Sequence, residues 1–238
     1  MSLKEKFIFN FIDDGRWHYI VDGLKVTLEV TFFAVLLGIA LGVIIAIVRS
    51  TYDKNKSSMR GFSKFIVVLL NFICKIYLTV IRGTPVVVQL MIMYFIVLVS
   101  SNNKVLVAVL AFGFNSAAYV AEIFRSGIMS IDEGQFEAGR SLGFNYVQTM
   151  RYIIIPQTLR RLIPLSINLA TRMIKTTSLI VMIGVVEVLK VGQQIIEANR
   201  YTVPDSALWI YVTIFFMYFL VCWPVSMLAG RLEKKWKN

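Results

Sequence analysis

The sequence carries little charge for its length. Asp, Glu, Lys and Arg make up 16% of 238 residues, 57% of the residues are hydrophobic, and the mean hydropathy is +0.70. Ordinary soluble domains carry about 25% charged residues, so this composition excludes one. The apolar residues gather in runs long enough to cross a bilayer as helices, for which about 20 residues are needed. The sequence therefore predicts an all-α, polytopic membrane protein.

Residues for several kinds of chemistry are scarce or missing. The chain has one histidine, His18, and two cysteines, Cys74 and Cys222, which lie far apart in apolar segments. A zinc site or a catalytic triad needs more partners than these, so no catalytic or metal site is expected. No G-x-x-x-x-G-K-[ST] phosphate loop is present. We therefore expect a chain that is not an enzyme and holds no cofactor of its own.

Acidic residues are also scarce: the sequence has 14 Asp and Glu but 25 Lys and Arg. A net charge of +11 is typical of some nucleic-acid-binding proteins, but no basic run lies on a soluble module, so no nucleic-acid partner is expected. In membrane proteins basic residues mark cytoplasmic loops. Five spans place the basic loop 49–60, the loop 130–156 and the C-terminus on the cytoplasmic side together, whereas six spans would put one basic loop outside. Residues 100–104 and 185–206 are then external.

The five expected spans form one membrane domain, 24–230. A polar and aromatic segment, 1–23, is expected to lie at the membrane interface before it, and the basic tail 231–238 follows it. The second span is expected to be one long element broken at Arg82-Gly83-Thr84-Pro85, because two separate spans would violate the charge distribution. The spans are Leu24–Val48, Phe62–Val99, Val105–Met129, Leu162–Gly184 and Ala207–Ala229.

One of the least apolar stretches, EAGRSLGFNYVQTMRYIIIP, runs from Glu137 to Pro156. It predicts a short helix that ends at Gly143, because glycine accepts the backbone angles of a helix stop. Pro156 then suits the first turn of the next helix. The stretch lies between two spans and therefore faces an aqueous side.

Polar side chains within the spans are costly and normally face the bundle interior or a water-filled path. Asn115, Tyr119 and Glu122 recur at spacings of four and three, so they share one helix face. The candidates for solute binding are Arg82, Thr84, Gln89, Asn115, Tyr119, Glu122 and Ser178. Arg82 suits a carboxylate and Glu122 an amino or guanidinium group. The alternative is that Arg82 and Glu122 only pair with each other.

The spacing of the Glu137–Pro156 stretch resembles the cytoplasmic pattern E-A-A, three residues, G, nine residues, I, one residue, L-P of ABC importer permeases. Gly139 stands for the second Ala and Ile155 for the Leu. The resemblance implies a coupling helix that docks on an ATPase subunit, and we expect the contact residues to be Glu137, Ala138, Gly139, Arg140 and Gly143. The segments RGTPVVVQ, NSAAYVAEIFRSGI, GQFEAGRSLG and KTTSL extend the resemblance to the histidine, glutamine and arginine permeases.

That resemblance also implies the other subunits of the transporter. It implies two ATP-binding subunits, which carry ATP and Mg, a second permease subunit, identical or homologous, and an extracytoplasmic solute-binding protein. The chain is then expected in a bacterial or archaeal cytoplasmic membrane, where it moves a polar or charged amino acid by alternating access. The competing hypothesis is an ion channel or secondary transporter subunit, which often shows internal repeats and broken helices. One expected helix is broken, but no repeat is present.

Overall fold

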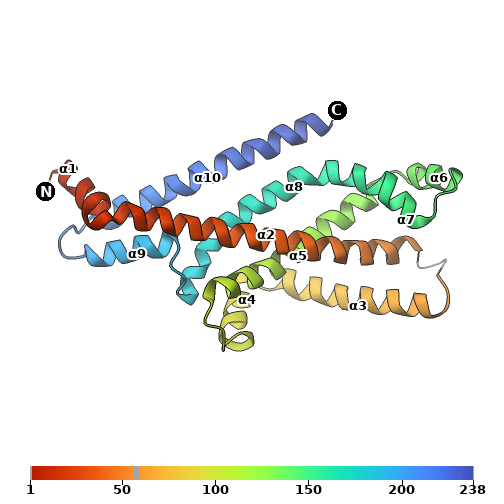
Figure 1. Cartoon of the computed structure of the whole chain (residues 1–238), viewed down its shortest axis with the longest axis horizontal. Helices are drawn as coiled ribbons and strands as arrows, with labels where there is room; N and C mark the ends of the chain where they lie inside the picture. The colour runs from red at the N-terminus through yellow and green to blue at the C-terminus, as the bar shows by residue number, and fades with distance from the viewer. Residues whose placement is uncertain (1, 56–58, 238) are drawn as a thin grey trace.

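The computed structural model describes residues 2–55 and 59–237, and in this part of the chain all regular structure is helical. Lys56, in the predicted basic loop, and Asn238, in the tail, lie outside the described residues. Figure 1 labels the α-helices in chain order. Their bounds are α1 Leu3–Phe7, α2 Arg16–Asn55, α3 Gly61–Gly83, α4 Val86–Ile92, α5 Lys104–Met129, α6 Glu133–Ser141, α7 Tyr146–Thr149, α8 Ile155–Thr176, α9 Val188–Ala198 and α10 Ser206–Lys237.

Four helices among the described residues are long and apolar enough to cross a membrane, and a bent pair supplies a fifth. The four are Lys4–Lys54, Gly61–Gly83, Lys104–Met129 and Ser206–Lys235. The pair joins Leu162–Ile183 to Val188–Ala198 with a bend of 51°. Counted this way, their number agrees with the five predicted spans, although the second half of the bent pair lies in residues predicted as an external link. The all-α prediction is confirmed.

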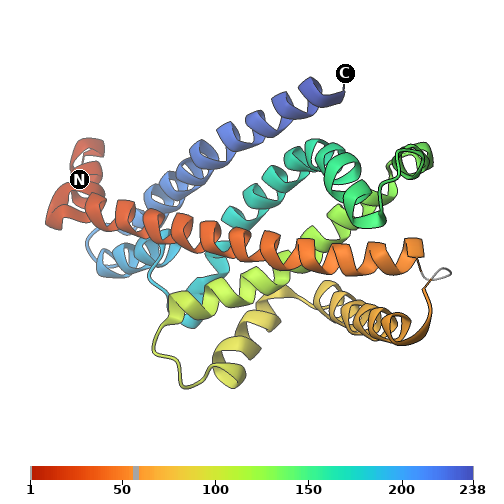
Figure 2. The same cartoon turned by 45° about the vertical axis from the view of Figure 1, so that its right-hand side comes forward.

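The second span is broken where the sequence predicts. The helix α3 ends at Gly83, Thr84 and Pro85 adopt extended backbone angles, and α4 begins at Val86. Proline cannot donate a backbone hydrogen bond, and it disfavours the helical conformation of the residue before it, which explains the stop. In Figures 1 and 2, α4 turns away from the direction of α3. The broken element therefore does not run straight through the bundle.

The core of the bundle is the long contact between α2 and α5. A Cβ added at Gly38 would lie 2.7 Å from the Ser116 Cβ, and one added at Gly42 would lie 2.6 Å from the Val120 Cβ. The small residues on both helices thus let the two backbones approach closely. The G-x-x-x-G motif of α2 is therefore a packing notch inside the subunit.

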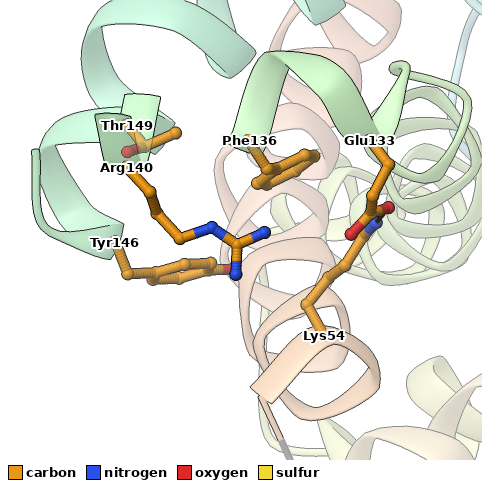
Figure 3. A pocket seen from close by; sticks show the side chains of 6 residues that line it. All are labelled: Lys54, Glu133, Phe136, Arg140, Tyr146 and Thr149. Atoms are coloured by element: carbon orange, nitrogen blue, oxygen red, sulfur yellow. Dashed lines mark hydrogen bonds and ion pairs between the residues drawn. The ribbon is translucent and has the colours of Figure 1, made fainter. Parts of the chain in front are cut away.

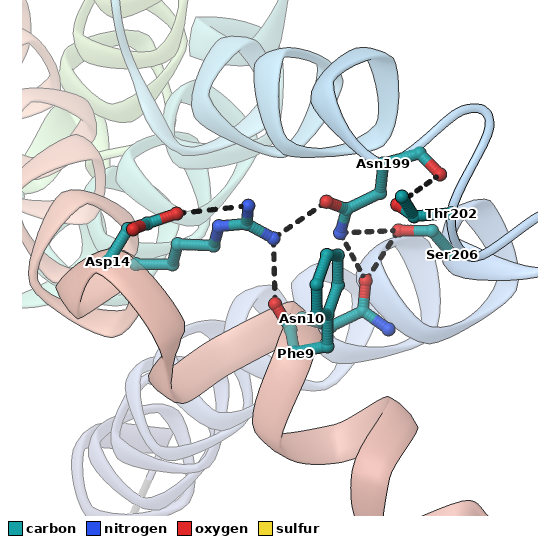
Figure 4. Close-up of polar contacts among 7 residues, drawn as sticks. Phe9, Asn10, Asp14, Asn199, Thr202 and Ser206 are labelled. Carbon is teal, nitrogen blue, oxygen red and sulfur yellow. Dashed lines mark hydrogen bonds and ion pairs between the residues drawn. The ribbon is translucent and has the colours of Figure 1, made fainter. Parts of the chain in front are cut away.

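The N-terminal segment is fixed to the far end of the chain. Asn10 is fully buried, and its side-chain oxygen accepts hydrogen bonds from Asn199 Nδ2 at 2.8 Å and from Ser206 Oγ at 2.5 Å (Figure 4). The helix α2 then begins at Arg16, eight residues before the predicted start of the span. Residues 185–206, expected as an external or partly re-entrant link, contain the helix α9, which packs against α2 and α10.

The helix ends separate into two groups along the long axis of the molecule (Figure 1). One end carries α1, α9 and the start of α10. The other carries the end of α2, the start of α3, and α6 with α7. The helix α10 runs from the first group toward the second. The end of α2, the start of α3 and the segment around α6 therefore lie at one end, as the charge argument requires.

Candidate functional site

A cluster of charged side chains from α2, α3 and α5 surrounds Glu122. The Glu122 carboxylate lies 2.6 Å from Arg125 Nη2, 3.2 Å from Arg49 Nη1 and 3.5 Å from Arg82 Nη1. Its side chain is 24% exposed, and Arg82 is the most exposed of the three arginines at 43%. Arg125 also reaches Asp53 Oδ2 at 3.1 Å. We call Arg49, Arg82, Arg125 and Glu122 the arginine cluster.

The arginine cluster joins three elements, α2, α3 and α5. It confirms that Arg82 and Glu122 meet, but Arg82 is the most distant of the three partners of Glu122. A single carboxylate that compensates three guanidinium groups is not free to bind a cationic group of a solute. The predicted pairing is therefore part of a larger network.

Tyr119 lies one turn before Glu122 on α5, and it contacts Arg82 of the arginine cluster and one further guanidinium group, that of Arg172. The Arg172 Cζ lies 4.5 Å from the centre of its ring, and the Arg82 Cζ lies 6.0 Å from it. A guanidinium over an aromatic face is attracted by the negative charge of that face. Arg172 belongs to α8, so four helices contribute side chains to this region.

The predicted amides form a second group next to the break. Asn115 Nδ2 donates to Gln89 Oε1 at 2.9 Å, and Gln89 Nε2 donates to Thr84 Oγ1 at 2.7 Å and to the Ile81 carbonyl at 2.8 Å. These bonds tie α4 back to the last turn of α3 and to α5. Gln89 thereby satisfies a carbonyl that the interrupted helix leaves without its usual partner.

Two hollows share the side chains of Arg82, Tyr119 and Glu122. One, of about 420 Å³, extends along α5 to Leu162 and Leu165 of α8. The other, of about 490 Å³, extends along α3 and α2 and is lined by Arg49, Lys75, Leu78, Thr79, Arg82, Gly83, Tyr119 and Glu122. Each has the volume of a small-molecule site.

Six of the seven predicted solute-binding residues lie in these two neighbouring groups. The exception is Ser178, whose hydroxyl donates to the Lys175 carbonyl within its own turn. Sequence reasoning missed Arg49, Arg125 and Arg172. Arg125 follows Glu122 at i,i+3, a spacing that predicts a helical ion pair. Arg49 and Arg172 reach the site only through helix packing, which the sequence alone does not specify.

The helix in the predicted coupling loop, α6, begins at Glu133, four residues before its expected start at Glu137. Asp132 caps α6 by accepting a hydrogen bond from the Gly134 amide, so the helix begins at Glu133. It ends where the sequence predicts, because Gly143 has a φ of +77° and the Phe144 amide donates to the Gly139 carbonyl. A residue in the left-handed conformation is a common helix stop.

Four of the five predicted coupling residues are exposed: Glu137, Ala138, Arg140 and Gly143. Gly139 is buried, and a Cβ added there would lie 2.7 Å from both Oγ1 and Cγ2 of Thr149. Gly139 thus permits the contact between α6 and α7. The continuation through residues 150–154 into α8 is helical, and Pro156 lies in the first turn of α8 as predicted.

A small hollow of about 150 Å³ lies between α6, α7 and the end of α2 (Figure 3). Lys54 Nζ lies 2.6 Å from Glu133 Oε2 and 4.6 Å from the centre of the Phe136 ring. Arg140 and Tyr146 line the opposite side. Burial raises the pKa of Tyr146 above its ordinary value, which keeps it uncharged near neutral pH. The contacts fix α6 to the end of α2.

Comparisons with known proteins agree with this geometry. Residues 38–238 match the family described as binding-protein-dependent transport system inner membrane component. The chain is 33% identical to the probable amino-acid ABC transporter permease protein YckA of Bacillus subtilis (strain 168), over 100% of this chain and 98% of that one. It is 34% identical to the glutamine transport system permease protein GlnP of Escherichia coli (strain K12), over 92% and 93%.

A solved structure is also similar: the crystal structure of an amino acid ABC transporter with histidines. The TM-score is 0.75 at 31% identity, over 91% of this chain and 94% of that chain. The family match covers far more than half of the sequence, so the competing hypothesis of an ion channel or secondary transporter subunit is abandoned. The chain belongs to the family of inner-membrane components of binding-protein-dependent transport systems, the permease subunits of ABC importers.

Proposed function

We propose that this permease subunit carries a polar or charged amino acid across the cytoplasmic membrane of a bacterium or archaeon. Support comes from two relatives and one solved structure whose names specify amino acids or glutamine. As a member of its family the chain is a multi-pass membrane subunit that works with ATPase partners and a binding protein. We further propose the stoichiometry of two ATPase subunits, which bind ATP and Mg, and two permease subunits, with the C-terminus of this chain in the cytoplasm.

The observation that carries the proposal is the meeting of four helices around Tyr119 and Glu122, beside two hollows. We place the solute path in those hollows, bordered by Arg82, Tyr119 and Glu122. Gln89 and Asn115, with Thr84, connect the path to the broken helix. Ser178 remains a weaker candidate, because its hydroxyl is satisfied locally. Charged groups inside a membrane protein normally line such paths.

The coupling part of the proposal concerns the exposed face of α6. Glu137, Ala138 and Arg140, with Gly143, would contact the ATPase, and Gly139 would support this face from behind. The contacts of α6 with Lys54 provide a mechanical connection from the ATPase to α2. The helix α2 in turn carries Arg49 of the arginine cluster.

The test is reconstitution of the complete complex in proteoliposomes with its ATPase and solute-binding protein. ATP hydrolysis should rise several-fold when a matching amino acid is supplied with the binding protein, and the amino acid should accumulate inside. Sugars and inorganic ions serve as controls. Stimulation by a sugar, with none by any of the twenty amino acids or cystine, would overturn the proposal.

A further inference from the structure

Arg172 is an arginine of α8 with no acidic partner among the described residues. Its guanidinium contacts the Tyr119 ring at 4.5 Å, and in the described chain we find no hydrogen bond or ion pair from it to an acceptor. Arg82 differs, because it pairs with Glu122. An arginine has five N–H donors in a planar fork that matches a carboxylate, and those of Arg172 are unused.

The position of Arg172 relates it to the solute path. Leu165 lines the hollow along α5 and α8, and Arg172 follows it by seven residues, which is two turns on the same face of α8. The exposed side chain of Arg172 contacts Tyr119, whose side chain lines both hollows. The contact with the aromatic face does not use the N–H groups of Arg172, and no acceptor among the described residues takes them.

The charge around the path favours an anionic group. Four guanidinium groups, those of Arg49, Arg82, Arg125 and Arg172, face two carboxylates, those of Glu122 and Asp53. Lys75 adds a further positive charge at the wall of the second hollow. Because Glu122 is already compensated by three arginines, the uncompensated charge of the region is positive.

We infer that Arg172 is a specificity-determining residue that binds the α-carboxylate of the transported amino acid through its guanidinium fork, while Arg82 stays in the arginine cluster. The inference rests on the proposed function, since it concerns the same path. It replaces the expectation that Arg82 takes the carboxylate. It also implies that an amino acid whose carboxylate is blocked as an amide loses its main anchor.

The test is equilibrium binding to the purified permease–ATPase complex without the solute-binding protein. The ligands are radiolabelled L-glutamine, L-histidine and L-arginine, each compared with its α-carboxamide. The wild-type complex should bind an acid more tightly than its amide by roughly tenfold to a hundredfold, the range of a hydrogen-bonded charge pair. Arg172→Gln should bind the acid more weakly and reduce the acid-to-amide ratio to about one.

The matched control is Arg200→Gln, which removes a guanidinium that also lies over a tyrosine ring, at 5.9 Å, on the link after α9. It should keep the wild-type ratio. Arg172→Lys, which keeps the charge and loses the fork, should give an intermediate ratio and replaces Arg172→Gln if that variant fails to assemble.

The outcomes separate the two proposals. If the wild-type complex binds none of the three amino acids, and no amino acid or cystine stimulates ATP hydrolysis in the proteoliposomes, the proposed function fails and the inference with it. If the wild type binds an acid and Arg172→Gln keeps the full preference over the amide, only the inference is wrong. Failure of both Arg172 variants to assemble with the ATPase assigns Arg172 a structural role and also overturns it.

Discussion

At the scale of single residues, the unequal sharing of charge around Glu122 gives a prediction. Glu122→Gln leaves three guanidinium groups without a counter-charge at this carboxylate, whereas Arg82→Met leaves Glu122 with Arg49 and Arg125. Breaking a poorly solvated charge network is strongly destabilising. We expect Glu122→Gln to lower the free energy of unfolding by about 2 kcal/mol more than Arg82→Met does. Thermal unfolding of the purified complex measures this difference.

The control is Glu197→Gln, which breaks the exposed pair of Glu197 with Arg200. Exposed pairs contribute about 0–1 kcal/mol, so this variant should unfold close to the wild type. Equal losses for Glu122→Gln and Arg82→Met would show that Glu122 does not hold the cluster together.

Gly143 gives a second prediction at this scale. Its φ of +77° is unfavourable for residues with a Cβ, yet an added Cβ would meet no atom of the described residues within 4 Å. The strain in Gly143→Leu is therefore a backbone effect of about 1–2 kcal/mol. We expect the variant to insert and to bind the ATPase poorly, so that ATP-driven uptake falls several-fold.

Gly143→Asn is the matched variant, because asparagine tolerates the left-handed conformation best among residues with a Cβ. Uptake by Gly143→Asn should exceed that by Gly143→Leu at equal amounts of inserted protein. If Gly143→Leu transports at the wild-type rate, the conformation at this position does not matter for coupling.

At the scale of elements, the sequence predicted what local chemistry determines. The break at Thr84-Pro85, the stop at Gly143 and the place of Pro156 all follow from the backbone limits of proline and glycine. The start of α6 at Glu133 also follows from local chemistry, because Asp132 is a good N-cap. The family pattern begins four residues later, at Glu137, and so does not mark this start.

Tertiary packing determines what the sequence did not reveal. The helix α2 begins at Arg16, after a segment in which Asn10 bonds to Asn199 and Ser206, 189 and 196 positions away. Arg49 and Arg172 likewise contact Glu122 and Tyr119 from helices that no local pattern connects to those two residues. Periodicity identifies the face of one helix, but not its neighbour.

The contact between α6 and α7 gives the prediction at this scale. A Cβ at position 139 would lie 2.7 Å from the Thr149 Oγ1 and Cγ2, so Gly139→Ala forces the two helices apart. Overpacking of this kind costs about 1–3 kcal/mol. We expect Gly139→Ala to lower both the thermal stability of the complex and the uptake per ATP hydrolysed.

Thr149→Ala provides the rescue. The buried Thr149 hydroxyl makes no hydrogen bond to the residues that the structure describes, so its removal alone should change stability little. The double variant Gly139→Ala with Thr149→Ala should recover most of the loss, since the two clashing atoms are gone. A Gly139→Ala protein as stable as the wild type would mean that the α6–α7 contact is looser than the structure shows.

At the scale of the whole molecule, the two groups of helix ends define the orientation in the membrane. The end with α6 and the loop after α2 carries exposed basic residues, among them Arg60 and Arg140, and the last helix continues toward it to Lys234 and Lys235. Basic residues next to spans stay in the cytoplasm. With five spans, the turn before α5 and the α9 region are then external.

Cysteine labelling tests this orientation. In a background with Cys74 and Cys222 replaced by alanine, Asn102→Cys in the turn before α5 should react with a membrane-impermeant maleimide added to intact spheroplasts. Ser141→Cys at the end of α6 and Lys235→Cys in α10 should react only after the membrane is permeabilised, because five spans place both on the inner side. All three positions are exposed in this chain, so in cells that lack the ATPase access to the reagent depends on the membrane. The five-span arrangement has two crossings between Ser141 and the tail, which puts both on the same side. Reaction of Lys235→Cys in sealed spheroplasts, with Ser141→Cys still protected, would mean an odd number of crossings there and would refute the arrangement.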